Sequence, residues 1–475
     1  MIKKLWNSPT FMTWGNLSAK SLGLILLLPL VLNKFEPADT VLWFLFFNIF
    51  AFQMLFDLGF SSSFIRIISY GVAGVEINNL DKIKDKKLNL DLGINWDTIF
   101  AIEKIMQKIY KRISFIGIVF GSVIGSLLLF TPIDASTNPV ESWLSWFIVL
   151  ISSFFMLYSS QYSSFLQGLG KVAVVQRWGM LSALLSIITT SMVLFFNGTL
   201  LEAIAAYQFW VIGSALLLRY LKRQIIQNHY MGTKYSDEEL ANVWKTVWSS
   251  AWRSGIGVFM SVGIIQLSGV IYSNLAPASK SVQYLFALQL IRAISSFSQA
   301  PFYSKIPIFS RLYASGKIEE LKVLAQKSMQ KSFIVYIVGF GIIGLLGDMI
   351  LNILHSKSQF PNSSLWIVLS LGILVERYGA MHIQLYSVTN HIIWHKANGY
   401  SGVTMIILTF MLFPLFDIMS FALSIVIAYT FIYSPYATKF SYKEFKTSFF
   451  QFEKFAFIPA LIAFVLFSIL IINKG

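Results

Sequence analysis

The sequence predicts an all-α protein that crosses a membrane many times, and three observations support this fold class. Of the 475 residues, 56% are hydrophobic and only 12% are charged, whereas a soluble domain carries about 25% charged residues. Apolar runs of about 20 residues, the length that a bilayer-spanning helix needs, recur along the whole chain. Ten-residue segments of alternating polarity, which are typical of outer-membrane barrels, do not occur. We predict two six-helix bundles in a parallel pseudo-twofold repeat around a central cavity, with an additional C-terminal helix.

The predicted spans follow from the apolar runs in order. The first half contains six of them: Phe11–Asn33, Val41–Phe64, Ile113–Thr131, Trp143–Leu166, Trp178–Phe196 and Leu200–Leu218. The second half also contains six: Gly255–Leu275, Val282–Tyr303, Phe333–Leu354, Leu365–Val388, Gly402–Phe416 and Met419–Tyr436. A thirteenth apolar run, Phe455–Asn473, follows a basic spacer and has no counterpart in the first half.

Lysine and arginine are distributed unevenly between the two sides of these spans. If the N-terminus is cytoplasmic, the inner segments carry 28 of the 37 basic residues, and the outer segments carry only Lys34, Lys280, Lys357 and Lys474. Positive residues concentrate on the cytoplasmic side of membrane proteins. We therefore expect a cytoplasmic N-terminus. The net charge of +15 then belongs to the membrane surface, and nucleic acid is not expected as a partner.

Three inner segments have amphipathic character. Residues 96–112 place Ile99, Ile102 and Ile109 on one helical stripe, and Ser236-Asp237-Glu238-Glu239 is a capping box that starts a second such helix. Residues 316–331 repeat the pattern. We expect these segments to form separate helices that lie on the anionic inner leaflet.

The two halves share an order of features that indicates an internal repeat. Each begins with a Trp near the inner end of a span, has a Pro in its first outer loop, and follows its second span with an amphipathic helix. Because six spans return the chain to its starting side, the halves enter from the same side. The expected domains are a bundle at 1–222, a cytoplasmic connector at 223–254, a second bundle at 255–438, and a basic spacer with a further membrane helix at 439–475.

Ionisable residues inside the spans mark candidate functional positions, because charge is costly in hydrocarbon. In the first half these are Lys20 and Asp57, in spans that a short loop joins. We expect the two to lie close enough to form an ion pair. The alternative is that Asp57 is a proton- or ion-coupling carboxylate, for H+ or Na+.

In the second half, Arg292 and Arg377 both lie about 16 Å from the inner ends of their spans, near the midplane. Glu376 precedes Arg377, and adjacent residues point about 100° apart on a helix. We therefore expect Glu376 to reach Arg292. This cluster keeps one surplus positive charge and could hold an anion, while a neutralised helix-packing network is the alternative. His382 is expected to be a packing residue.

No motif predicts a metal or an enzyme. The chain has no cysteine, its five histidines lack ligand spacing, and we expect no bound cofactor. A polysaccharide polymerase or ligase would need a catalytic outer loop, and the outer loops are short and poor in acids and bases.

Two phrases resemble a known family. Phe56-Asp57-Leu58-Gly59-Phe60, followed by Arg66, resembles the second helix of O-antigen-type polysaccharide flippases. The phrase from Pro307 to Gly316 is similar to the one after their eighth helix. These flippases belong to the multidrug/oligosaccharidyl-lipid/polysaccharide (MOP) exporter superfamily. The residues 71–111 and the thirteenth span depart from its simplest pattern.

The resemblance implies a flippase of the bacterial inner membrane that moves an undecaprenyl-diphosphate-linked oligosaccharide by alternating access. Arg292, Arg377 and Lys20 would then contact the substrate, and other polysaccharide-assembly proteins would be possible partners. An ion-coupled drug or metabolite antiporter of the same superfamily is the nearest alternative, and Asp57 keeps it open. A scaffold without transport activity would not explain the midplane charges.

Overall fold

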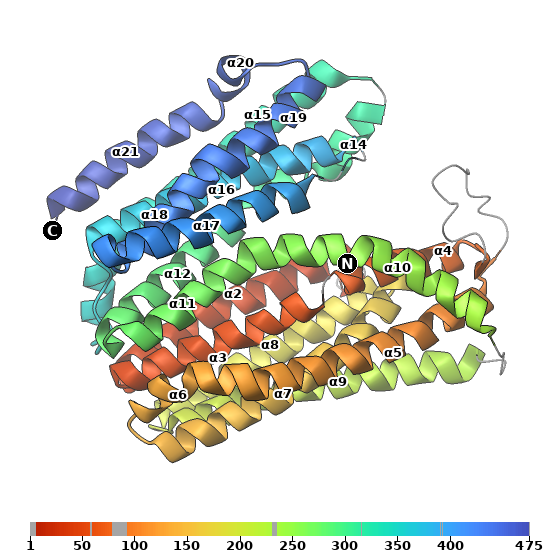
Figure 1. Cartoon of the computed structure of the whole chain (residues 1–475), viewed down its shortest axis with the longest axis horizontal. Coiled ribbons are helices and arrows are strands. Elements are labelled where there is room, and N and C mark those ends of the chain that lie inside the picture. The colour runs from red at the N-terminus through yellow and green to blue at the C-terminus, as the bar shows by residue number, and fades with distance from the viewer. Residues whose placement is uncertain are drawn as a thin grey trace. The chain divides into compact units, whose positions relative to one another are not determined.

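The computed structural model describes residues 6–57, 59–77, 93–229, 235–314, 316–389, 391 and 393–474. Within these residues every regular element is a helix and none is a strand (Figure 1), which confirms the predicted fold class. The chain divides into two compact units, Met1–Ile256 and Gly257–Gly475. The basic residues Lys82, Lys84, Lys86, Lys87 and Lys234 lie outside the described residues.

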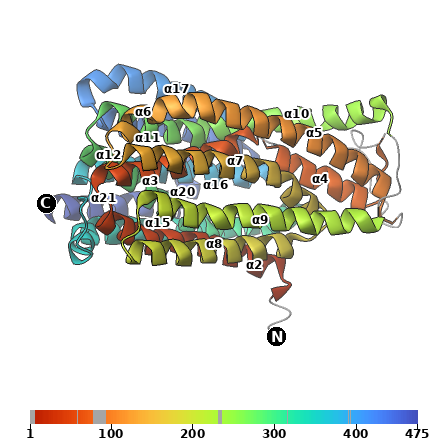
Figure 2. The same ribbon diagram turned by 90° about the horizontal axis from the view of Figure 1, so that it is seen from below.

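Within the described residues, the first unit holds eight complete α-helices, most of a ninth and one short π-helical segment. Its elements are α2 (Pro9–Lys34), α3 (Pro37–Phe56), α4 (Phe60–Val72), α5 (Trp96–Phe120), η3 (Gly121–Gly125), α6 (Ser126–Asp134), α7 (Pro139–Gly168), α8 (Val172–Phe195), α9 (Leu200–His229) and most of α10 (Asp237–Val258). In this unit α8 lies between α2 and α9 (Figure 2) and packs against both. Asn95 and Asn138 cap α5 and α7 with their side chains, which satisfies backbone N–H groups at the helix starts.

The second unit continues from the end of α10. Its elements are η4 (Phe259–Gly263), α11 (Ile264–Leu275), α12 (Ala278–Ser298), α13 (Ala300–Tyr303), α14 (Ile306–Ala314), α15 (Ile318–Ile353), α16 (Ser363–Ser387), α17 (Trp394–Phe416), α18 (Met419–Ala428), η5 (Tyr429–Tyr433), α19 (Ser434–Glu444), α20 (Phe449–Glu453) and α21 (Phe457–Lys474). Its core is one cluster that includes Trp366, Tyr336 and Phe340.

The two units repeat the same packing order. In the first unit, α2 packs against α8, α8 against α9, α5 against α7 and α4 against α7. The corresponding pairs of the second unit are α11 with α17, α17 with α18, α15 with α16 and α12 with α16. Since equivalent elements find equivalent partners, the repeat inferred from the order of sequence features is present in the fold.

The second helix is interrupted near its C-terminal end in both units. In the first unit α3 ends at Phe56 and α4 starts at Phe60, and Gly59 adopts φ 73°. Glycine reaches this left-handed conformation without the steric cost that a Cβ brings. In the second unit α12, α13 and α14 follow one another with short breaks, next to Pro301 and Pro307. The prediction of one unbroken span at 41–64 is therefore wrong.

The three predicted interfacial helices are not separate elements. Residues 96–134 form one continuous helix of 39 residues, and residues 318–353 form one of 36. The capping-box helix likewise continues from Asp237 to Val258. At 1.5 Å per residue the 39-residue helix is about 58 Å long, longer than the roughly 30 Å hydrocarbon core. The amphipathic segments are thus extensions of spans, because no proline or glycine ends the helix between 104 and 116 or between 319 and 338.

The apolar helices identify a multi-pass membrane protein. Within the described residues, nine helices are long and apolar enough to cross a membrane, or ten if the bent pair at 255–275 is one span. They include the thirteenth predicted span, now α21. The predicted spans at 11–33, 41–64 and 282–303 are not in that count.

Candidate functional site

Arg377 lies on α16 and is almost completely buried within the second unit, with 5% of its surface exposed. Its Nη2 donates to Ser295 Oγ of α12 at 2.8 Å and to Glu376 Oε2 at 3.0 Å. When the amide oxygen of Gln299 faces the guanidinium, that oxygen accepts from Nη2 at 3.2 Å and from Nη1 at 3.3 Å. Ser295 of α12, Glu376 of α16 and Gln299, which lies between α12 and α13, therefore hold the guanidinium. Its Nε stays buried without a hydrogen-bond partner in the described part of the chain.

Glu376 pairs with its sequence neighbour and not with Arg292, so the predicted Glu376–Arg292 contact is wrong. The Glu376 and Arg377 side chains form an ion pair of 3.0 Å. Long side chains can bend toward each other even though their Cβ atoms point about 100° apart. The pair leaves Arg292 of α12 without a carboxylate partner within the described residues.

Arg292 is a partly buried cation with an unused donor. Its Nη2 is buried and has no hydrogen-bond partner in the described part of the chain. Tyr284 of α12 and Tyr429 of η5 lie close enough to interact with it electrostatically. A buried guanidinium donor without an acceptor is costly, and this cost is relieved when an anion or water accepts from it.

Tyrosines surround the charged pair as well. Tyr303, Tyr336 and Tyr433 lie within electrostatic range of Arg377, and the Tyr336 hydroxyl is itself occupied by the Ser370 carbonyl at 2.8 Å. The cluster of Arg292, Glu376 and Arg377 carries one net positive charge. Within the described residues, Arg292 offers a guanidinium donor that has no partner, beside the neutralised Glu376–Arg377 pair and among tyrosine side chains. This arrangement suits an anionic ligand.

Lys20 and Asp57 are not brought together, so the predicted ion pair is wrong. Asp57 lies at the break between α3 and α4 and accepts from Ser61 N–H at 3.1 Å, from Ser61 Oγ at 2.9 Å and from the Tyr110 hydroxyl of α5 at 2.5 Å. Lys20 is an exposed residue of α2. Within the described residues, no ion pair joins the two side chains.

Two buried charge clusters were not predicted. In the first unit, Lys222 of α9 pairs with Glu103 of α5 at 2.6 Å and also contacts Gln161 Oε1 of α7 at 3.4 Å. Glu103 is four residues after Ile99, on the apolar stripe of its helix. In the sequence, the signal for this buried charge is the position of an acidic residue, Glu103, on an apolar helical stripe.

The second cluster surrounds His382 of α16, which is fully buried. His382 Nε2 lies 2.9 Å from Glu453 Oε1, and its Nδ1 lies 3.1 Å from Ser441 Oγ. The Tyr442 hydroxyl also donates to Glu453 Oε1 at 2.8 Å. His382 therefore packs against α19 and α20 and holds the basic spacer, which precedes α21, to α16.

The fold is shared with solved structures of MOP superfamily transporters. An inward-facing multidrug resistance MATE family transporter matches with TM-score 0.61 and 12% identity over 92% of this chain and 99% of that one. The lipid II flippase MurJ, in an inward closed conformation, matches with TM-score 0.61 and 13% identity over 98% of both chains. An outward-facing MATE transporter matches with TM-score 0.53 and 12% identity, over 93% of this chain and 97% of that one.

No protein-family model and no curated protein sequence matches the chain. At identities of 12–13% the likeness identifies the fold, and one fold serves several substrates.

Proposed function

We propose that this protein is a flippase that moves an undecaprenyl-diphosphate-linked oligosaccharide across the bacterial inner membrane by alternating access, for surface polysaccharide assembly. The fold supports transport, since solved structures with this fold are a lipid II flippase and multidrug transporters. A diphosphate and its sugars cannot cross hydrocarbon unaided, and a polar, mildly cationic site can replace their water while the lipid tail stays in the bilayer.

The observation that carries the proposal is the buried Nη2 of Arg292, which has no acceptor within the described residues. A diphosphate oxygen would supply that acceptor. Arg377 would add a second, weaker contact because Glu376 already neutralises it. Lys20, exposed on α2, is proposed as a substrate-binding cation of the first unit.

The test distinguishes Arg292, whose Nη2 has no acceptor within the described residues, from Arg377, which pairs with Glu376. In a strain that lacks its own flippase, surface polysaccharide is measured beside the amount of protein in the membrane. We expect Arg292→Lys to lower polysaccharide partially, because lysine offers phosphate a point charge in place of a bidentate donor. We expect Arg292→Glu to abolish it, because the charge at this position is reversed. Protein levels should stay normal in both variants. Arg377→Gln should lower protein level as well, since it removes the contacts to Ser295 and Glu376.

The exposed Arg223 of α9 gives the matched control, and Arg223→Glu should leave both measurements unchanged. Full polysaccharide with Arg292→Glu at normal abundance would exclude Arg292 from the substrate site. Loss of protein together with loss of polysaccharide would instead assign Arg292 to helix packing.

An ion-coupled drug or metabolite antiporter is the second candidate, because the MATE transporter matches with the same TM-score as the flippase. Such a transporter would use a carboxylate to couple transport to an H+ or Na+ gradient. Increased drug sensitivity in a deletion strain with intact surface polysaccharide would favour this candidate.

A further inference from the structure

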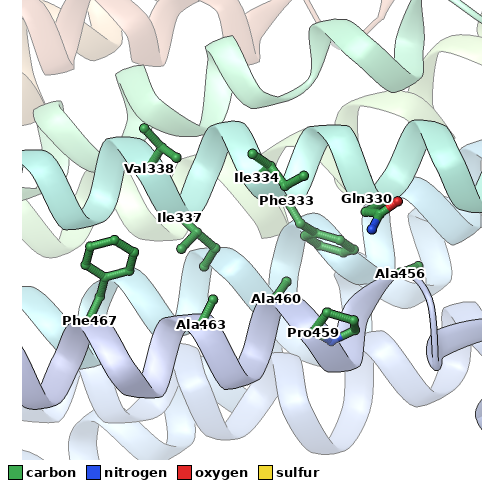
Figure 3. Close-up of a pocket in the computed structure, with 10 residues that line it drawn as sticks. All are labelled: Gln330, Phe333, Ile334, Ile337, Val338, Ala456, Pro459, Ala460, Ala463 and Phe467. Carbon is green, nitrogen blue, oxygen red and sulfur yellow. The ribbon is translucent and has the colours of Figure 1, made fainter.

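A groove of about 300 Å³ lies between α15 and α21 of the second unit. Figure 3 shows Ile334 and Ile337 of α15 on one side, and Ala460 and Ala463 of α21 on the other. Phe467 closes one end of the groove and Gln330 lies at the opposite end. Apart from Gln330, every lining residue is apolar.

The width of the groove follows from the sizes of the facing side chains. Toward the Phe467 end the helices are in tight contact, because a Cβ on Gly341 would lie 2.6 Å from Phe467 and one on Gly344 would lie 2.5 Å from Ile471. Further toward Gln330, α21 presents alanines opposite α15. Small side chains at this end leave space that protein atoms do not fill.

The Gln330 end of the groove is basic. Lys327 lies three residues before Gln330 and seven before Ile334, so it occupies the same face of α15. Lys331 lies at the edge of that face, and Lys454 precedes the lining residue Ala456 by two positions. All three lysines are exposed. The groove is therefore apolar along its length and has basic side chains at one end.

We propose that this groove binds one anionic phospholipid of the surrounding bilayer, with an acyl chain between α15 and α21 and the phosphate at Lys327, Lys331 and Lys454. Charge complementarity selects this occupant, since basic residues beside apolar surface between membrane helices attract anionic head groups. The acyl chain contacts the apolar lining residues of the groove, which include Phe333 of α15 and Phe467 of α21. Gln330 marks the boundary between the acyl chain and the head group of the lipid. This proposal is independent of the transported substrate.

Native mass spectrometry of the purified full chain tests the proposal with phosphatidylglycerol and phosphatidylcholine of identical acyl chains. The wild type should retain one phosphatidylglycerol molecule at least fivefold more than phosphatidylcholine. Ala463→Phe should remove this bound lipid, because the ring fills the groove. The triple variant Lys327→Gln, Lys331→Gln, Lys454→Gln should bind both lipids equally, since only the head-group contacts are lost.

Two matched controls come from the same unit. Val465→Phe places an identical ring on an exposed position of α21 and should keep the lipid. The triple variant Lys396→Gln, Lys439→Gln, Lys443→Gln removes the same charge from α17 and α19 and should keep the preference for phosphatidylglycerol.

Three results would overturn the proposal. Equal lipid retention by Ala463→Phe and Val465→Phe would exclude the groove as the binding site. A bound polyprenyl phosphate that phosphatidylglycerol does not displace would assign the groove to a different lipid. A dimer mass that Ala463→Phe abolishes would assign the groove to a second copy of the chain.

Discussion

At the residue scale, the contacts of Asp57 favour a structural role for its carboxylate. It holds the first turn of α4 through Ser61 N–H and ties α4 to α5 through the Tyr110 hydroxyl. A side-chain acceptor at a helix start stabilises that helix by about 0.5–2 kcal/mol. The same carboxylate remains the best candidate for ion coupling, so a substitution must separate the two roles.

We expect Asp57→Asn to lower the free energy of unfolding by less than about 1 kcal/mol, because Asn can still accept from Ser61. We expect Asp57→Ala to lower the free energy of unfolding by about 1–2 kcal/mol. Thermal unfolding of the purified protein measures this order. Transport should survive Asp57→Asn if the role is structural. Stable Asp57→Asn protein without transport would show that the charge itself is needed.

The Glu103–Lys222 pair makes a second prediction at this scale. Removing one member of a buried ion pair leaves an uncompensated charge and costs about 3–5 kcal/mol. Lys222 is 3% exposed and Glu103 is 8% exposed, so Glu103→Gln should destabilise the protein by roughly this amount.

Adding Lys222→Met to Glu103→Gln should recover most of the lost stability, and this coupling is measured by a double-mutant cycle. Arg223→Gln, one residue further on and exposed, is the control and should have little effect. If the loss of stability in the double variant equals the sum of the losses in the two single variants, the two side chains are not energetically coupled.

At the element scale, α21 is held by glycines of α15 that allow close approach. Gly341→Leu should displace α21, because a Cβ at this position would already lie 2.6 Å from Phe467. The chain has no cysteine, so Ser468→Cys introduces a unique and buried thiol. Maleimide labelling of that thiol should rise several-fold in Gly341→Leu. Gly399→Leu, where no atom lies within 4 Å of the added Cβ, should leave the labelling unchanged.

At the scale of the whole molecule, the topology remains a prediction from the positive charge bias. Reporter fusions at Gly170 and Gly316 should report the cytoplasm, and fusions at Ser136 and Pro277 the periplasm. A fusion at Thr447, before α21, should report the cytoplasm, and one at Lys474 the periplasm. The same side for Thr447 and Lys474 would show that α21 does not cross the membrane.

Much of the fold could be predicted from the sequence, because hydropathy is a local property. A run of 18 or more apolar residues indicates a span whatever its neighbours are, and α21 was found in this way. The order of features also predicted the repeat that the packing pairs display. The continuous helices were missed because a change from amphipathic to uniformly apolar sequence was interpreted as a break, although polarity alone does not end a helix.

The sequence by itself determined which charges lie in the spans and that such charges need partners. Only the tertiary structure decided who the partners are: Tyr110 for Asp57, Arg377 for Glu376, and Glu453 for His382. The physical reason is that a side-chain contact depends on which helix faces meet and at what depth. His382 and Glu453 are 71 residues apart, and no local pattern relates two such distant positions.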